Sequence, residues 1–215
     1  MTSAPPHVAV HATAHRDVTP DQFEATVLVA CRRATAGDAA QALTAGFAKV
    51  EDALGALPAE LDVTARRSGV SQRRVVWAEQ APEWVASRSV SLTSHEVEQA
   101  GAVLGPFAAL IDVVDGLELD GPTWRVDREN PAHGELQAEA VHEAVARARR
   151  YAAALGSTLG PLLELGDPGQ SGQLREQAYA RAAYRGREGF ETMDFTPVPI
   201  EVEVGVNASW ALILP

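Results

Sequence analysis

The chain has 215 residues, of which 46% are hydrophobic and 22% are charged, the balance of an ordinary globular protein that can bury a sizeable core. Acidic residues outnumber basic residues by 29 to 18, so the formal charge is −11 at neutral pH, and this charge disfavours binding to nucleic acid or to anionic lipid. The single cysteine excludes a disulfide framework and a zinc site built from several cysteines.

The first quarter of the chain is predicted to form two strands followed by a helix. Apolar and polar residues alternate over 8–14 and again over 23–31, which is typical of half-buried strands. The predicted helix covers 36–57 and ends at Pro58, because proline cannot continue the backbone hydrogen bonds. Its apolar residues recur at helical spacing and form one face: Leu43, Phe47, Val50 and Leu54.

The middle of the chain is predicted to alternate between strands and one further helix. The predicted strands cover residues 61–67, 74–79, 85–92, 113–119 and 123–126, with a turn at 120–122 between the last two. Residues 93–96, Thr-Ser-His-Glu, have the pattern of a capping box. They would open a helix that reaches Phe107, and Gly105-Pro106 would kink or end it.

The longest predicted helix covers residues 131–155 and ends at Gly156. Its apolar stripe is predicted to be Val141, Val145, Ala148, Ala152 and Leu155, opposite a polar side with Glu135, Glu139, His142, Glu143, Arg149 and Arg150. Strands are predicted over 162–165 and 200–214. Helices and strands are mixed without strict alternation, so we expect an α+β fold, a mostly antiparallel sheet packed by about three helices. The whole chain would be one domain or two interlocked subdomains.

Residues 166–197 are predicted to be a variable insertion that is partly helical, over about 171–184, or mobile. This segment is rich in glycine, glutamine and arginine, and such long insertions are usually functional or mobile. Arginine interleaved with aromatic residues is typical of contact surfaces, so six residues are candidate contacts for a partner or an anionic ligand: Arg175, Tyr179, Arg181, Tyr184, Arg185 and Arg187. A solvated loop is the alternative. Trp77 and Trp84 are candidate surface aromatic residues, with the same alternative.

No combination of residues predicts catalysis, a metal site or a cofactor site. Neighbouring members of the trio His7, His11 and His15 would be about 13 Å apart on a strand, too far to hold one metal ion; a metal shared between subunits is the alternative. Cys31 falls on the apolar side of its strand, where a thiol stays protonated. Residues 156–160 lack the lysine of a phosphate loop. We therefore expect a protein that is not an enzyme.

Two acidic patterns are interpreted as surface features. Glu139 and His142 form a single Glu-x-x-His pair, whereas di-metal bundles need two such pairs. The acids around the predicted turn do not have the spacing of a calcium loop: Asp112, Asp115, Glu118 and Asp120.

Several segments, in their order and spacing, resemble the SIMPL-domain family of bacterial proteins of poorly defined function. They are VAVHATAHRDVTPDQFEATVLV, DAAQALTAGFAKVEDALGAL, WVASRSVSLTS, AEAVHEAVARARRYAAALGSTLGPLLEL and FTPVPIEVEVGVNASWAL. The resemblance implies helices packed on antiparallel sheet and, for some members, assembly into oligomers. It carries no catalytic residues.

The resemblance leads to a functional prediction. We expect a non-enzymatic, self-associating protein, a homo-oligomer whose strand edges and arginine-rich insertion make the contacts. The alternative is a module in which the insertion binds a small anionic ligand or a protein partner. Many family members are exported, including an outer-membrane immunogen group. The first 15 residues here show neither the basic nor the apolar region of a signal peptide, and no apolar run approaches a membrane span, so we expect a cytoplasmic protein.

Overall fold

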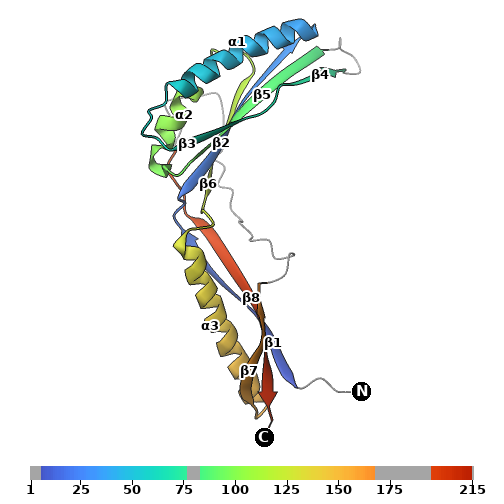
Figure 1. The fold of residues 1–215 in the computed structure, drawn as a ribbon, viewed down its shortest axis with the longest axis vertical. Helices are drawn as coiled ribbons and strands as arrows, with labels where there is room; N and C mark the ends of the chain where they lie inside the picture. Colours follow the sequence, from blue (N-terminus) through green and yellow to red (C-terminus); the bar gives the residue numbers. More distant parts are fainter. Residues whose placement is uncertain (1–5, 77–82, 168–194, 215) are drawn as a thin grey trace. The chain divides into compact units, whose positions relative to one another are not determined.

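The computed structural model of the protein describes residues 6–76, 83–167 and 195–214 (Figure 1). These residues form antiparallel strands and helices, which confirms the predicted α+β class. Contacts between residues divide the chain into two compact units. Unit 1 consists of residues 1–19, 126–178 and 199–215, and unit 2 of residues 20–125 and 179–198.

Unit 1 contains a three-stranded antiparallel sheet with one long helix against it. The strand order is β1 (His7–Val18), β8 (Ile200–Ile213) and β7 (Thr158–Gly166), so β8 is central. β1 and β8 pair without interruption from His7 opposite Ala211 to Val18 opposite Ile200. The helix α3 (Pro131–Ala154) packs on the face that carries the alternating apolar residues of β1 and β8.

The buried stripe of α3 is made mostly of alanine, and the prediction was right for Ala148 and Ala152 but wrong for its other members. The fully buried side chains are Leu136 and four alanines spaced four residues apart: Ala140, Ala144, Ala148 and Ala152. The predicted residues Val141 and Val145 are only partly buried, and Leu155 is 66% exposed. The small alanine side chain allows the helix backbone to approach the sheet closely, so the alanine row is the one that faces β1 and β8.

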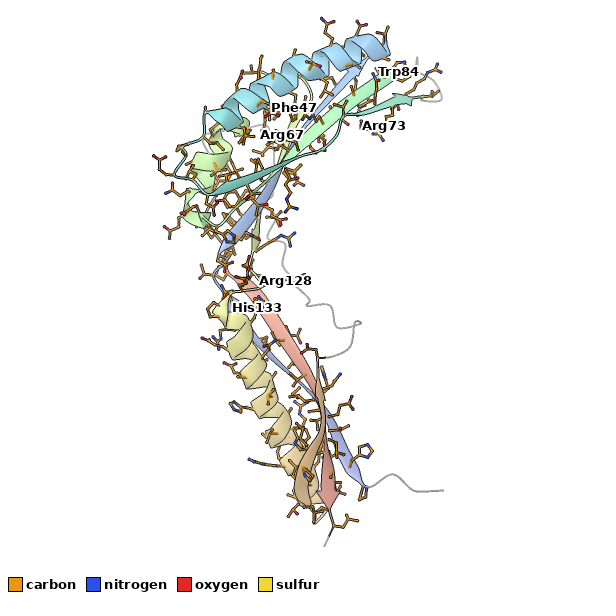
Figure 2. The ribbon with its side chains drawn as sticks, viewed as in Figure 1. Phe47, Arg67, Arg73, Trp84, Arg128 and His133 are labelled. Atoms are coloured by element: carbon orange, nitrogen blue, oxygen red, sulfur yellow. The ribbon has the colours of Figure 1, made fainter. Side chains whose placement is uncertain are left out.

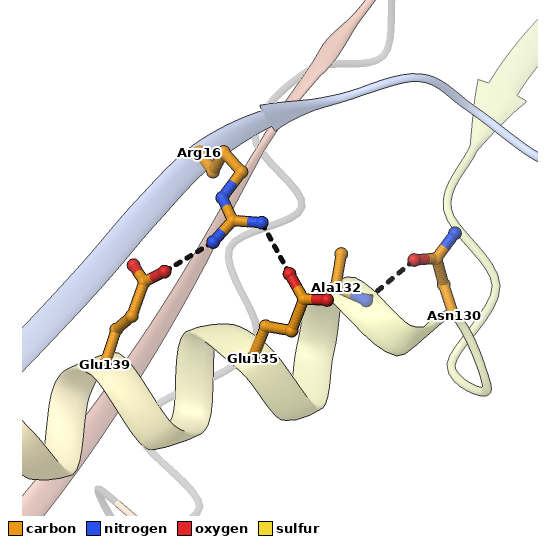
Figure 3. A network of polar contacts seen from close by, with 5 residues as sticks. All are labelled: Arg16, Asn130, Ala132, Glu135 and Glu139. Atoms are coloured by element: carbon orange, nitrogen blue, oxygen red, sulfur yellow. Dashed lines mark hydrogen bonds and ion pairs between the residues drawn. The ribbon is translucent and has the colours of Figure 1, made fainter.

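Both ends of α3 are capped, and ion pairs join its polar side to β1. The Asn130 side chain accepts a hydrogen bond from the Ala132 N–H at 2.9 Å (Figure 3). At the other end, the Ser157 N–H donates to Ala152 O at 2.9 Å and the Gly156 N–H to Ala153 O, the Schellman pattern of a helix end at Gly156. Arg16 of β1 forms ion pairs with Glu135 and Glu139 (Figure 3).

Unit 2 contains a five-stranded antiparallel sheet. The strands are β2 (Gln22–Arg33), β3 (Val63–Arg67), β4 (Ser71–Val75), β5 (Glu83–Ser94) and β6 (Leu117–Arg125), in the order β3-β5-β2-β6. β4 also pairs with β5, so β3 and β4 lie one after the other along the same side of that strand. The strand predicted over 74–79 corresponds to β4, which begins earlier, at Ser71, and ends at Val75, while residues 77–79 lie outside the described residues.

The described part of unit 2 includes the helices α1 (Ala36–Gly55) and α2 (Ala100–Ala108). α1 packs against β2 and β5 through Ala39, Leu43, Phe47 and Val50. On the sheet, the side chains that pack against α1 are alternate residues of β2, including Val27 and Val29, which are fully buried. The rings of Phe23 and Trp124 meet edge to face, with centroids 5.9 Å apart.

The capping prediction for the helix α2 was wrong. Thr93 and Ser94 do not cap a helix, because both are the last residues of β5, where Ser94 lies opposite Phe23 and Val63. The short 3-10 turn Val97–Gln99 then leads into α2. Pro106 does not end the helix, which continues to Ala108; burial of residues on both sides of the proline, such as Leu104 and Phe107, offsets the missing hydrogen bond.

The predicted turn at 120–122 is a bulge within one continuous strand. β6 runs from Leu117 to Arg125, and its register against β2 shifts between Glu24 and Thr26. Gly121 has φ +116° and precedes a cis bond to Pro122. A proline is tolerated at a bulge because no ladder hydrogen bond is required there.

Candidate functional site

The open face of the unit 2 sheet holds a polar groove of about 550 Å³. It lies on the side of β2, β3 and β5 opposite the face that packs on α1, because its side chains alternate with the buried ones along each strand. Its polar lining comes from β2 (Gln22, Glu24 and Thr26), from β3 and the residue before it (Asp62, Thr64 and Arg66), and from β5 and the residue after it (Ser91, Thr93 and His95).

Strand register arranges these nine side chains as a lattice of three rows. One row runs from Thr64 through Thr93 to Glu24, and the next from Arg66 through Ser91 to Thr26. The Gln22 and His95 side chains, 3.4 Å apart between Nε2 atoms, belong to the third row with Asp62. Hydroxyl groups thus occupy the middle of the groove.

The charged residues of the groove differ in whether they are paired. Glu24 is neutralised by Arg125, whose guanidinium lies 2.9 Å from its carboxylate, and the hydroxyls of Thr26 and Ser91 are 3.5 Å apart. By contrast, the side chains of Asp62 and Arg66 form neither an ion pair nor a hydrogen bond with any residue that the structure describes.

This groove was not predicted from the sequence. The alternation of polar residues in β2 and in the segment Ser-Val-Ser-Leu-Thr of β5 was visible, but it predicts only a solvated strand face. The groove depends on β5 lying between β2 and β3, and this pairing joins segments that are far apart in the chain.

Unit 1 has a second notable surface along the outer edge of β7. β7 is an edge strand, and Leu162, Leu163 and Leu165 are 49%, 53% and 50% exposed. Seven of the eleven large hydrophobic residues exposed in the described part of the chain belong to unit 1, with Tyr151, Leu155, Ile213 and Leu214 completing the set. Apolar groups are therefore concentrated on this unit.

Most of the candidate residues from the sequence analysis lie outside the described residues. These are Arg175, Tyr179, Arg181, Tyr184, Arg185, Arg187 and Trp77, together with nearly all of the predicted insertion over 166–197. Trp84 is described: it lies near the start of β5, half-buried, opposite Arg33 of β2 and Arg74 of β4 (Figure 2).

His11, Cys31 and Asp115, which were also considered in the sequence, each contact neighbouring groups of the protein. His11 lies on the exposed face of β1, with Nδ1 2.9 Å from the Asn207 side-chain oxygen. Cys31 is 2% exposed, and its burial, followed by the nearby Asp115 carboxylate, raises the pKa of the thiol. Asp115 itself pairs with Arg33 at 2.8 Å. Within the described ranges, no group of three or more histidine, cysteine, aspartate or glutamate side chains could hold a metal ion.

A family model matches the chain. The family model SIMPL, described as a protein of unknown function (DUF541), matches residues 8–210 and so covers nearly the whole chain. No curated protein matches the sequence. None of the helices in the described part of the chain is both long and apolar enough to cross a membrane.

Proposed function

Because this chain belongs to the SIMPL family, whose description assigns no function, we propose from its own surfaces that it is a non-enzymatic protein that associates with copies of itself. The observation that carries the proposal is the edge of β7, where a strand edge that no described strand pairs with coincides with three half-exposed leucines. An exposed apolar strand edge is a template for pairing with another chain.

A proline and two register shifts interrupt this edge, but only as far as Glu164. Pro161 and two register shifts, between Leu159 and Leu162 and between Leu162 and Glu164, interrupt the start of β7. Proline and bulges are the usual devices that prevent edge pairing. The segment from Glu164 to Gly166 lies beyond both shifts, carries a single charge, Glu164, and is where a second copy would pair.

The test is the absolute mass in solution, measured by light scattering on a sizing column at tens of micromolar protein and at two salt concentrations. We expect a discrete oligomer that persists in high salt, because apolar contacts are not screened. The double variant Leu163→Lys/Leu165→Lys should shift the mass toward 22.8 kDa. Val70→Lys is the matched control, since Val70 is 64% exposed but belongs to unit 2.

Two results would overturn the proposal: a wild-type mass of 22.8 kDa throughout, or an oligomer that the double variant leaves unchanged. An oligomer that dissociates in high salt would favour charged contacts such as those predicted over Arg175–Arg187.

That segment is also the basis of the second candidate function, binding of a small anionic ligand or a protein partner, which its arginine and aromatic composition supports. A thermal-shift screen of anionic metabolites tests it, since a ligand of the native state raises the melting temperature.

A further inference from the structure

We propose that the polar groove on the open face of unit 2 binds a short peptide of about three residues with free termini. The proposal is independent of self-association, which concerns unit 1. It rests on the charges, hydroxyl groups and size of the groove, formed by described residues of β2, β3 and β5.

The charges of the groove match a molecule with one positive and one negative end. The side chains of Arg66 and Asp62 have no partner among the described residues. Arg66 lies on β3 and Asp62 directly before it, four positions away, which corresponds to about 13 Å along an extended chain. Both side chains are exposed in the described part of the chain, and a zwitterion could bridge them. A free amino acid is too short for this separation, whereas three extended residues span about 10 Å and the two side chains can lean inward.

The floor between these two charges suits peptide groups. Thr64 and Thr93 lie in the row between the two charges, and each presents a hydroxyl that can donate and accept a hydrogen bond, while a peptide bond offers one donor and one acceptor. The two apolar lining residues, Ala25 and Leu92, are buried and belong to the opposite face of the sheet. The described lining of the groove therefore offers no apolar or aromatic subsite, which favours small side chains such as alanine over a large apolar residue or a stacked sugar ring.

The volume is consistent with this ligand. The groove measures about 550 Å³, within the ~300–1,000 Å³ of typical small-molecule sites. His95 and Gln22 at one end, and Ser91 and Thr26 at the other, can complete the hydrogen bonding around the two termini.

The test is isothermal titration calorimetry of the full chain with trialanine and three blocked forms: N-acetylated, amidated, and both. We expect trialanine to bind with a dissociation constant of about 1 mM or tighter. Each single block should weaken binding about tenfold or more, because it removes one charge-assisted contact. No binding of trialanine, or equal binding of the doubly blocked peptide, would overturn the proposal.

Variants assign each terminus to its residue. Arg66→Gln should abolish the preference for a free carboxylate but keep the preference for a free amine, and Asp62→Asn should do the reverse. Arg73→Gln is the control: Arg73 lies on β4 beyond the groove (Figure 2) and should leave binding unchanged. Both substitutions in the groove are of side chains at the surface, so their thermal unfolding should match that of wild type. If Arg66→Gln and Asp62→Asn retain both preferences, the groove is not the site and the proposal fails.

Discussion

The guanidinium of Arg88 lies over the ring of Phe47, with Cζ 4.3 Å from the ring centroid. Arg88 comes from the helix-covered face of β5 and lies opposite Val29, while Phe47 is 3% exposed on the inner side of α1. The pair therefore joins the sheet of unit 2 to its main helix by a cation–π contact.

We expect Arg88→Gln to lower the free energy of unfolding by about 1 kcal/mol, the usual value of a partly desolvated cation–π contact. The measurement is urea denaturation followed by circular dichroism. Arg73→Gln provides the comparison, because it removes an exposed arginine that has no aromatic partner among the described residues. Equal stability of these two variants would contradict the contribution assigned to the Phe47 contact.

Two glycines should respond to alanine in opposite directions. Gly116 has φ +73°, and a Cβ there would lie 2.2 Å from the Ala30 carbonyl oxygen, so Gly116→Ala should cost more than about 2 kcal/mol. Gly134 lies inside α3, and a Cβ added there would meet no described neighbour within 4 Å, so Gly134→Ala should stabilise by about 0.5–1 kcal/mol. Thermal unfolding of both variants checks the signs, and a neutral Gly116→Ala would show that β2 can move away from the turn.

The alanine stripe of α3 should not tolerate larger residues. Ala144 is fully buried against β1 and β8, so Ala144→Leu should destabilise unit 1 by about 1–3 kcal/mol through overpacking. Ala138 is exposed on the same helix, and Ala138→Leu should change stability by less than about 0.5 kcal/mol. Chemical denaturation distinguishes them. A small effect at Ala144 would mean that the helix can shift away from the sheet at little cost.

Stability should depend on pH through Glu51. Arg67 donates three hydrogen bonds to its carboxylate, at 2.7, 2.8 and 3.1 Å, and these lower the pKa of Glu51 below its ordinary value. Because the folded-state pKa is the lower one, the contribution is present above the ordinary glutamate pKa of about 4.3 and is lost as the pH falls through the folded-state value. The stability difference between wild type and Arg67→Gln should be largest near neutral pH and shrink in acid. A difference that grows in acid would contradict this sign.

Patterns within one segment predicted the elements of this fold well. Alternation identified β1 and β2, and the spacing of Leu43, Phe47 and Val50 identified α1, because strands and helices that bury one face must repeat with periods of about 2 and 3.6 residues. The helix end at Gly156 was also predicted, since local chemistry decides it.

Features that depend on a neighbouring segment were predicted less well. The sequence at Thr93 and Ser94 matches the start of a helix capping box, but pairing of β5 with β2 and β3 keeps both residues extended. Valine is more hydrophobic than alanine, so Val141 and Val145 were assigned to the buried stripe, yet close approach of α3 to the sheet selects the alanines. The polar groove needs three strands in the right order and register, which no single segment encodes.

The pairing of β1 with β8 has a consequence for synthesis of the protein. His11 and Asn207, which meet across these strands, are 196 positions apart in the chain. At about 5–20 residues per second, β1 leaves the ribosome roughly 10–40 s before its partner strand exists. Residues 20–125 of unit 2 lie between them and can fold during this interval, so unit 1 is completed last. A nascent chain stalled before residue 200 should therefore contain a protease-resistant unit 2 beside an unprotected β1.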